Sequence, residues 1–319
     1  MSDPGLTRAA DFARRLAESI PADRILRHAP LAPFTTFKVG GPADWLVLAA
    51  RSSEVKAAIA LARACGLPIV VLGGGSNVLV ADAGVRAVVI RVHGGDAAAA
   101  GDGLIRADAG LTINGLVRWT INRGYAGLEA WAGTPGTVGG AIYGNAHFKG
   151  RNIGDMVHAV EVVDANGHVV RIPAAGMEFG YDRSRLQRTR EIALSAEFRV
   201  GRGDPAALRA VARASLAYRK QTQPLEAASA GCIFQNPDPA LDRVPDGLPA
   251  SAGALVDRAG LKGAREGSAR VSPTHGNFVI NEGGASAADI RRLIERCRDA
   301  VRTEFGVELR DEIVYLGEG

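Results

Sequence analysis

The chain has 319 residues, enough for two or three domains of about 100–150 residues each. It is 47% hydrophobic and 23% charged with a formal net charge of +4, the balance of an ordinary globular protein. No run of five or six like charges and no basic helix with interleaved aromatic residues occurs, so nucleic acid is not an expected partner. The longest apolar stretches are too short to cross a bilayer, and no membrane insertion is expected.

The three cysteines, Cys65, Cys232 and Cys297, have no C-x-x-C spacing, which argues against a disulfide framework and a zinc site. No metal is therefore expected, and a reducing compartment fits best. Residues 1–30 carry charges throughout and lack the apolar core of a secretory signal. These features predict a cytoplasmic protein, and we expect a monomer because no long unpaired apolar surface is evident.

In the first part of the chain, a short helix is expected over residues 8–20. Val55, Ile59 and Ala62 recur at helical spacing and predict a helix over 53–65. Apolar runs predict strands over 45–50, 68–72, 78–80 and 88–90, with another strand pair between about 100 and 112. The alanine cluster Ala97–Ala100 is expected to be a loop.

Further along, a helix is expected over 111–123, and Asp164-Ala165-Asn166-Gly167 predicts a hairpin turn between strands 157–163 and 168–172. Composition turns loop-like at 201–204, where a domain boundary is expected. A helix is predicted over 205–218, and the last domain includes 251–259 and a final helix. Ser286 with Asp289 forms a capping-box pattern for the last helix, and a strand is expected over 312–316.

The loop Gly73-Gly74-Gly75-Ser76-Asn77 follows a buried strand. Consecutive glycines direct backbone N–H groups to one side and favour an anion-binding nest, to which Ser76 and Asn77 would add donors. The alternative is a tight turn with no ligand. Because the loop leads into another strand and lacks a P-loop lysine, both the common dinucleotide-binding fold and the P-loop are excluded.

A second glycine-rich segment spans residues 127–141, with four glycines and a proline between Gly133 and Gly140. Such a segment loses much conformational entropy on folding, at roughly 0.5–1 kcal/mol per glycine relative to alanine. Two segments of this kind in one chain favour a ligand site over two empty turns.

Three segments, 35–43, 73–79 and 133–141, resemble the FAD-binding domain of the vanillyl-alcohol-oxidase-type flavoproteins. The chain more closely resembles the UDP-N-acetylenolpyruvoylglucosamine reductase family. The segments that carry this resemblance follow in family order: 219–224, 229–237, 252–263, 272–281 and 306–313. It covers roughly residues 30–317 and matches the shorter subclass, without the tyrosine-bearing loop.

The resemblance implies an α+β protein: a two-subdomain FAD-binding fold of the vanillyl-alcohol-oxidase/PCMH type, followed by a C-terminal α+β substrate-binding domain. The expected divisions are a helical lead-in over 1–30, the FAD-binding domain over 31–202 and the substrate domain over 203–319. The two FAD-binding subdomains would meet near residues 93–94.

The implied reaction has two halves. NADPH reduces FAD, and hydride then passes to the enolpyruvyl ether to give UDP-N-acetylmuramate for peptidoglycan synthesis. No histidine or cysteine lies beside the Gly73 loop, so noncovalent FAD is expected. The expected FAD-binding residues are Gly73, Gly74, Gly75, Ser76, Asn77, Val78, Leu79, Gly133, Thr134, Pro135, Gly136, Gly139, Gly140 and Ala141.

Cys232 stands where the family has its proton donor, usually serine and in some members cysteine. A thiol, with a reference pKa of about 8.5, is a better acid than an alcohol. A lone cysteine is otherwise more often inert and buried. Glu312 matches the family's catalytic glutamate, and Glu308 is a weaker candidate nearby.

The family also has an arginine in a Tyr-Arg-x-Ser frame, proposed to bind the substrate carboxylate. This chain reads Tyr181-Asp182-Arg183-Ser184-Arg185, so Asp182 occupies the arginine position. Arg183 is expected to serve as the catalytic arginine after a one-residue shift of the loop, with Arg185 as a further candidate. The alternative is that these residues are surface charges.

Lys220, Asn236 and Tyr181 are the expected substrate contacts, and Gln235 replaces the family's usual lysine. His275 is expected to have a packing role. Two other functions stay open: a different FAD-dependent sugar or alcohol oxidase of the same fold, and a catalytically impaired paralogue that binds UDP-sugars.

Overall fold

The computed structural model describes residues 11–317, and these fall into two compact units that interleave along the chain. The first unit comprises Met1–Ala29, Ala43–Gly74 and Arg86–Ala217. The second comprises Pro30–Pro42, Gly75–Val85 and Tyr218–Gly319. The domain boundaries expected from the sequence stay a prediction. Of the helix predicted over 8–20, residues 8–10 lie outside the described part, and residues 11–16 are helical.

The first unit contains a four-stranded sheet in the order β1-β2-β5-β3. Its strands are β1 (Ile25–Pro30), β2 (Pro42–Ala49), β3 (Ile69–Leu72) and β5 (Val85–Val92). Helix α2 (Ser52–Ala64) connects β2 to β3, which runs parallel to β5. Val55 and Ile59 of α2 pack with Val47 and Ile90 in one buried cluster, so the predicted apolar face of this helix is confirmed.

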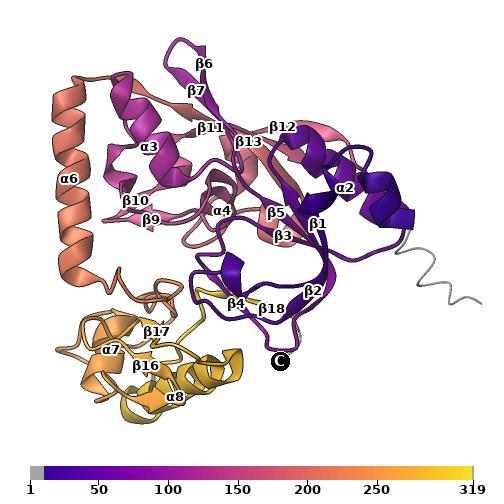
Figure 1. The fold of residues 1–319 in the computed structure, drawn as a ribbon. Helices are drawn as coiled ribbons and strands as arrows, with labels where there is room; N and C mark the ends of the chain where they lie inside the picture. Colours follow the sequence, from indigo (N-terminus) through magenta and orange to yellow (C-terminus); the bar gives the residue numbers. More distant parts are fainter. Residues whose placement is uncertain (1–10, 318–319) are drawn as a thin grey trace, which may run out of the picture. The chain divides into compact units, whose positions relative to one another are not determined.

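A five-stranded antiparallel sheet in the order β12-β11-β13-β7-β6 also belongs to the first unit (Figure 1). Its strands are β6 (Ala97–Gly101), β7 (Leu104–Asp108), β11 (Val157–Val163), β12 (Val169–Pro173) and β13 (Ile192–Arg199). The predicted hairpin turn is confirmed: Asp164 Oδ1 accepts hydrogen bonds from the Asn166 and His168 N–H groups, and Gly167 has φ +89°.

The expectation that Ala97–Ala100 is a loop was wrong, because these residues form strand β6. Ala97 pairs with Ala107 and Ala99 with Ile105, so the backbone of β6 is held by its neighbour β7. Ala98 to Ala100 are exposed. Four alanines in a row carry no alternation of apolar and polar side chains, which is the signal on which strand prediction depends.

The remaining helices of this unit cover a core that contains Trp131, Leu116 and Phe198. They are α3 (Ile113–Asn122), α4 (Val138–Tyr143), α5 (Leu186–Thr189) and the first part of α6 (Pro205–Thr222). Short strands lie between them: β8 (Tyr125–Ala126), β9 (His147–Phe148), β10 (Arg151–Asn152) and β14 (Gly201–Arg202).

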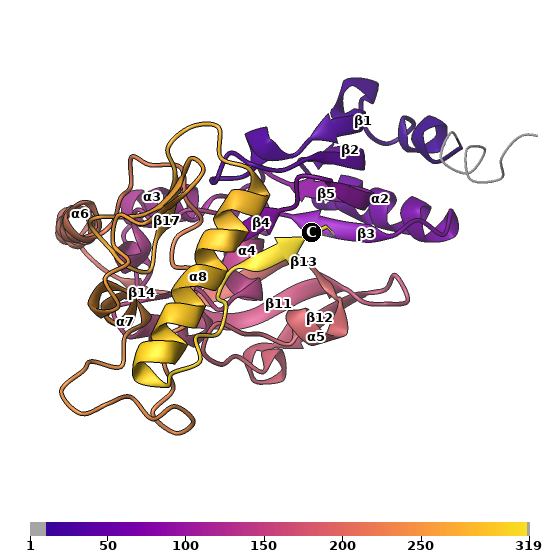
Figure 2. The same ribbon diagram turned by 90° about the horizontal axis from the view of Figure 1, so that it is seen from below.

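In the second unit a three-stranded antiparallel sheet packs with two helices, and Figure 2 shows the longer one, α8, in yellow. The elements are α7 (Ala252–Arg258), α8 (Ala287–Phe305), β15 (Arg265–Glu266), β16 (Ala269–Val271) and β17 (Val279–Asn281). A second, parallel pair joins β4 (Val78–Val80) to β18 (Val314–Leu316). The capping box predicted for α8 is confirmed, since Ser286 and Asp289 exchange both of its hydrogen bonds. None of the helices between residues 11 and 317 has the length and apolar composition needed to cross a membrane.

The Arg24–Glu54 ion pair joins the end of a short N-terminal turn to helix α2, and its Glu54 side chain is only 7% exposed. Burial alone would raise the pKa of Glu54, but hydrogen bonds from Arg24 and the Ala50 N–H outweigh it and lower the pKa. A carboxyl group whose pKa is lowered in the folded state stabilises the fold at pH values above its ordinary pKa of 4.5. This stabilisation is lost as the pH falls through the lowered pKa.

We therefore expect Glu54→Gln to lower the free energy of unfolding by about 1–3 kcal/mol at pH 7, because a charged hydrogen-bonded pair is lost. The difference from the wild type should shrink in acid, below about pH 4. Urea titrations at several pH values measure both quantities. Glu178→Gln is the control, because the Glu178–Arg188 pair of the same unit is mostly exposed and should change stability little. An equal loss of unfolding free energy in both variants would contradict the view that the buried Glu54 pair stabilises the fold more than an exposed pair does.

Candidate active site

The first half of the glycine loop, Gly73 and Gly74, lies against the second glycine segment inside the first unit. A Cβ atom on Gly74 would be 2.6 Å from the Gly136 Cα, and one on Gly73 would be 2.5 Å from the Thr137 Oγ1. Real Cβ atoms do not approach other atoms so closely, so these positions require glycine. The two segments that the sequence singled out are therefore neighbours, in direct backbone contact.

The second half of the loop begins at Gly75, which belongs to the second unit and has φ +64°. A Cβ here would overlap the Phe34 carbonyl oxygen. Gly75 O accepts a hydrogen bond from the Thr36 N–H at 3.0 Å. Within residues 11–317, the N–H groups of Gly75 and Ser76 donate to no acceptor, although Gly75 is buried. Buried donors need acceptors, and a phosphate oxygen would satisfy them.

Asn77, which is expected to bind the cofactor, also makes contacts within the second unit. Its Nδ2 donates to the Glu312 carbonyl at 3.0 Å, and its own carbonyl accepts from the Val314 N–H at 3.0 Å. Val78 and Leu79 continue as strand β4 and pair with Val314 and Tyr315. This end of the loop therefore holds the C-terminal strand.

The second glycine segment is fixed at both of its ends. Gly133 has φ +83°, and its N–H donates to Asn114 Oδ1 at 2.7 Å. Thr137 is the N-cap of α4, where its side chain accepts from the Gly140 N–H. The Gly139 N–H donates to the Ala109 carbonyl at 2.8 Å. Thr134, Pro135 and Ala141 lie in the same segment.

The chemistry of the Gly73–Ser76 loop suits a phosphate group. Gly73 and Gly74 bring no side chain between the loop and Gly136, Gly75 keeps a buried N–H group to donate, and the Ser76 hydroxyl is a further donor.

Cys232 and Glu312 are 80 residues apart but lie on neighbouring segments of the second unit. The Glu312 N–H donates to the Ile233 carbonyl at 2.8 Å, and Phe234 and Asp311 form a β-bridge. On the other side, the Asn277 carbonyl accepts from the Ile233 N–H at 2.9 Å. Cys232 is half-buried. The two residues that the sequence selected are thus held by one backbone network.

Arg219 was missed at the sequence level. It is 6% exposed in the last turns of α6, and its Nη1 donates to Gln223 Oε1 at 3.4 Å. Burial lowers the pKa of Arg219 to about 10, although a thiolate at Cys232 would raise it, so the guanidinium is charged at neutral pH. Helical spacing was the available signal, because Arg219 continues the buried face marked by Ala212 and Ser215.

The expected substrate contacts are positioned as follows. Lys220 is exposed on the last turn of α6. Asn236 is also exposed, and its Oδ1 accepts from the Ala252 N–H at 3.0 Å, at the start of α7. His275 packs edge-on against Phe278, and its Nδ1 accepts from the Asn277 N–H. Burial, and then the charge of Lys262, lowers the pKa of His275.

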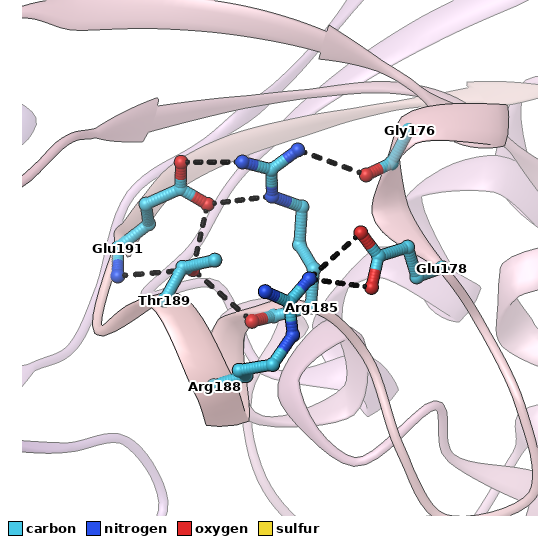
Figure 3. A network of polar contacts seen from close by, with 6 residues as sticks. All are labelled: Gly176, Glu178, Arg185, Arg188, Thr189 and Glu191. Carbon is cyan, nitrogen blue, oxygen red and sulfur yellow. Dashed lines mark hydrogen bonds and ion pairs between the residues drawn. The ribbon is translucent and has the colours of Figure 1, made fainter.

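Arg183 and Arg185, the two candidates for the catalytic arginine, have different surroundings. Arg185 donates to both oxygens of Glu191, at 2.8 and 2.9 Å, and to the Gly176 carbonyl at 3.1 Å (Figure 3). These bonds hold its guanidinium in a structural network. Arg183 is exposed, lies along Gly180 in a tight turn, and forms no ion pair within the described part of the chain.

Asp182 contacts a residue that the sequence did not single out. Its Oδ1 is 3.0 Å from Nδ1 of His147, and its side chain is only 8% exposed. The His147 ring also packs against Tyr181, with centroids 5.0 Å apart. Thirty-five positions separate the pair in the chain, and no local pattern announces such a contact.

Comparison with known proteins gives matches over both parts of the chain. Residues 43–173 match the family described as FAD binding domain, and residues 223–316 match UDP-N-acetylenolpyruvoylglucosamine reductase, C-terminal domain. The UDP-N-acetylenolpyruvoylglucosamine reductase of Heliobacterium modesticaldum is 38% identical over 296 residues, which cover 92% of this chain and 91% of that protein.

The enzyme of the same name from Bacillus velezensis is 36% identical over 296 residues, covering 92% of this chain and 94% of its own. Among solved structures, UDP-N-acetylenolpyruvylglucosamine reductase from Thermus caldophilus superposes with a TM-score of 0.77 at 34% identity. That superposition covers 92% of this chain and 99% of the Thermus chain.

Proposed function

This chain belongs to the UDP-N-acetylenolpyruvoylglucosamine reductase family, and from that premise we propose that it reduces UDP-N-acetylglucosamine enolpyruvate to UDP-N-acetylmuramate with NADPH as the reductant. It is an oxidoreductase and a flavoprotein, with an FAD-binding domain and the α+β fold expected from the sequence. The product supplies peptidoglycan synthesis, and we propose that the enzyme works as a cytoplasmic monomer.

FAD, when bound, supplies the hydride that is added to the vinyl ether. Gly73–Leu79 and Gly133–Ala141 would hold the cofactor, with the unused N–H groups of Gly75 and Ser76 donating to phosphate oxygens. The other residues bind the substrate, supply a proton and stabilise developing charge.

In the proposed chemistry, the Cys232 thiol gives its proton to the carbon next to the one that accepts hydride. The carbon–carbon double bond becomes a single bond, and a thiolate is left behind. Glu312 orients or shares that proton. One observation carries this assignment: the Glu312 N–H bonds to the Ile233 carbonyl, which brings the backbones of both candidates together within the second unit.

The substrate has three further contacts in this proposal. Lys220 offers a point charge to the diphosphate, and Asn236 offers its amide to uracil or phosphate. Tyr181, with 45% of its surface exposed, contacts the sugar side. Arg183 is the arginine proposed for the substrate carboxylate, because Arg185 is bound to Glu191 and Gly176.

A spectrum and a coupled assay test this function. The purified protein should be yellow, with flavin absorption bands, and should oxidise NADPH rapidly only when UDP-N-acetylglucosamine enolpyruvate is present. UDP-N-acetylglucosamine, which lacks the enolpyruvyl group, is the control and should not be reduced. Turnover of a simple sugar or alcohol with oxygen, or flavin without turnover of the enolpyruvyl ether, would contradict the proposal.

A further inference from the structure

In the second unit, the segment that carries Glu312 is paired by backbone hydrogen bonds with the segment that follows Cys232. The Glu312 N–H donates to the Ile233 carbonyl at 2.8 Å. The Gln235 N–H donates in the other direction, to the Arg310 carbonyl at 2.9 Å. These bonds set the register of the two backbones, but the direction of a side chain also depends on what holds its neighbours.

Arg298 of helix α8 contacts both of these paired segments. Its Nε donates to the Leu309 carbonyl at 3.2 Å, and its Nη2 donates to Oδ1 of Asp311. The guanidinium carbon lies 5.7 Å from the centre of the Phe234 ring. Phe234 and Asp311 are themselves joined by a β-bridge. A single side chain therefore connects the segment before Glu312 to the segment after the proposed proton donor.

The Arg298–Asp311 ion pair is partly buried and is supported by a rigid element. The two side chains are 22% and 28% exposed. Burial alone would lower the pKa of Arg298, but the charge of Asp311 and its hydrogen bond outweigh burial and raise the pKa, so the guanidinium is charged at neutral pH. Helix α8 is anchored beside it by Ile294, Cys297 and Val301, which are at most 1% exposed. Residues supported by packed helices hold a site more precisely than loops do.

Asp311 directly precedes Glu312, and its β-bridge indicates extended backbone. Consecutive side chains in extended backbone point to opposite sides, so holding Asp311 against α8 also fixes the direction of its neighbour. We propose that Arg298 positions the proton-transfer site, holding the Glu312 carboxylate in register with the Cys232 thiol. This proposal rests on the proposed function. Arg298 is a positioning residue, because it acts through Asp311 and Phe234 rather than by contact with the substrate.

Stopped-flow absorbance of the holoenzyme tests the proposal. The flavin is reduced by NADPH and then reoxidised anaerobically by UDP-N-acetylglucosamine enolpyruvate. Arg298→Gln should slow reoxidation by about 10- to 100-fold, because small misplacements of reacting groups have effects of this size. Asp311→Asn, which keeps the size of the side chain, should slow reoxidation as well, and Arg298→Lys, which keeps the charge, should recover part of the rate. Flavin content and reduction by NADPH should stay within about two-fold of wild type.

Two comparisons separate positioning from a general loss of stability. Arg296→Gln is the matched control, because Arg296 lies on the same helix and pairs with Glu266 of strand β15 at 3.2 Å. This variant should reoxidise at the wild-type rate. In a Glu312→Gln background, Arg298→Gln should change the rate by less than about two-fold, because the carboxylate that it positions is absent.

Reoxidation at the wild-type rate in either Arg298→Gln or Asp311→Asn would overturn the inference. An equal loss in Arg296→Gln, or a full further loss when Arg298→Gln is added to Glu312→Gln, would also overturn it. If the enolpyruvyl ether does not reoxidise the reduced wild-type enzyme, the proposed function fails instead.

Discussion

Replacing Cys232 by alanine is expected to slow reduction of the enolpyruvyl ether by about 10²–10⁴-fold, the usual contribution of a positioned proton donor. Reduction of the flavin by NADPH should be unchanged, because that half-reaction requires no proton from the thiol. Stopped-flow absorbance separates the two halves: flavin bleaching is followed with NADPH alone, and its reoxidation is followed after the substrate is added anaerobically.

Serine at position 232 is the matched variant, because it keeps a proton donor of similar size and should recover much of the reoxidation rate. The buried Cys297 is not an alternative donor, since burial raises the pKa of its thiol to about 12. Loss of flavin bleaching in Cys232→Ala, or reoxidation at the wild-type rate, would contradict the proton-donor assignment.

Gly74→Ala is expected to yield protein with little or no FAD and lower stability. A Cβ at this position would be 2.6 Å from the Gly136 Cα, which is a backbone atom and cannot move away as the end of a flexible side chain does. The two glycine segments must separate, which costs about 1–3 kcal/mol as in other overpacked sites. The ratio of flavin to protein absorbance and the urea midpoint measure the two effects.

Gly144→Ala is the control for this substitution. Gly144 lies just after α4 in the same unit, has φ −93°, and a Cβ there would meet nothing closer than 3.8 Å. This variant should retain FAD and unfold close to the wild type. A Gly74→Ala protein with full flavin content would show that the close approach of the segments is not needed to hold the cofactor.

Much of the fold could be read from local patterns. Ser286 and Asp289 predicted the start of α8, and the turn at Asp164–Gly167 predicted the β11–β12 hairpin; both depend on hydrogen bonds between residues close in sequence. Ala97–Ala100 was misjudged because its strand is held by pairing with β7. Propensity carries little information where side chains bury almost nothing.

Part of the candidate site was also accessible from sequence. Arg219, which the sequence interpretation passed over, continues a buried helical face and could have been found by that spacing. Asn77 shows a contact that its residue type does not predict: its side chain, for which a cofactor contact is expected, donates to the Glu312 carbonyl. An amide can satisfy either partner, so its residue type alone does not decide between them.

By itself, the sequence determined the two glycine segments, the ordered motifs of the family and the selection of Cys232 and Glu312. These depend on residue types and on spacing along the chain. The tertiary structure decided which backbone each glycine approaches, that Arg185 is held by Glu191, and that Asp182 contacts His147. The reason is physical: contacts between residues tens of positions apart exist only after the chain has folded, and many partners satisfy the same carboxylate, amide or guanidinium.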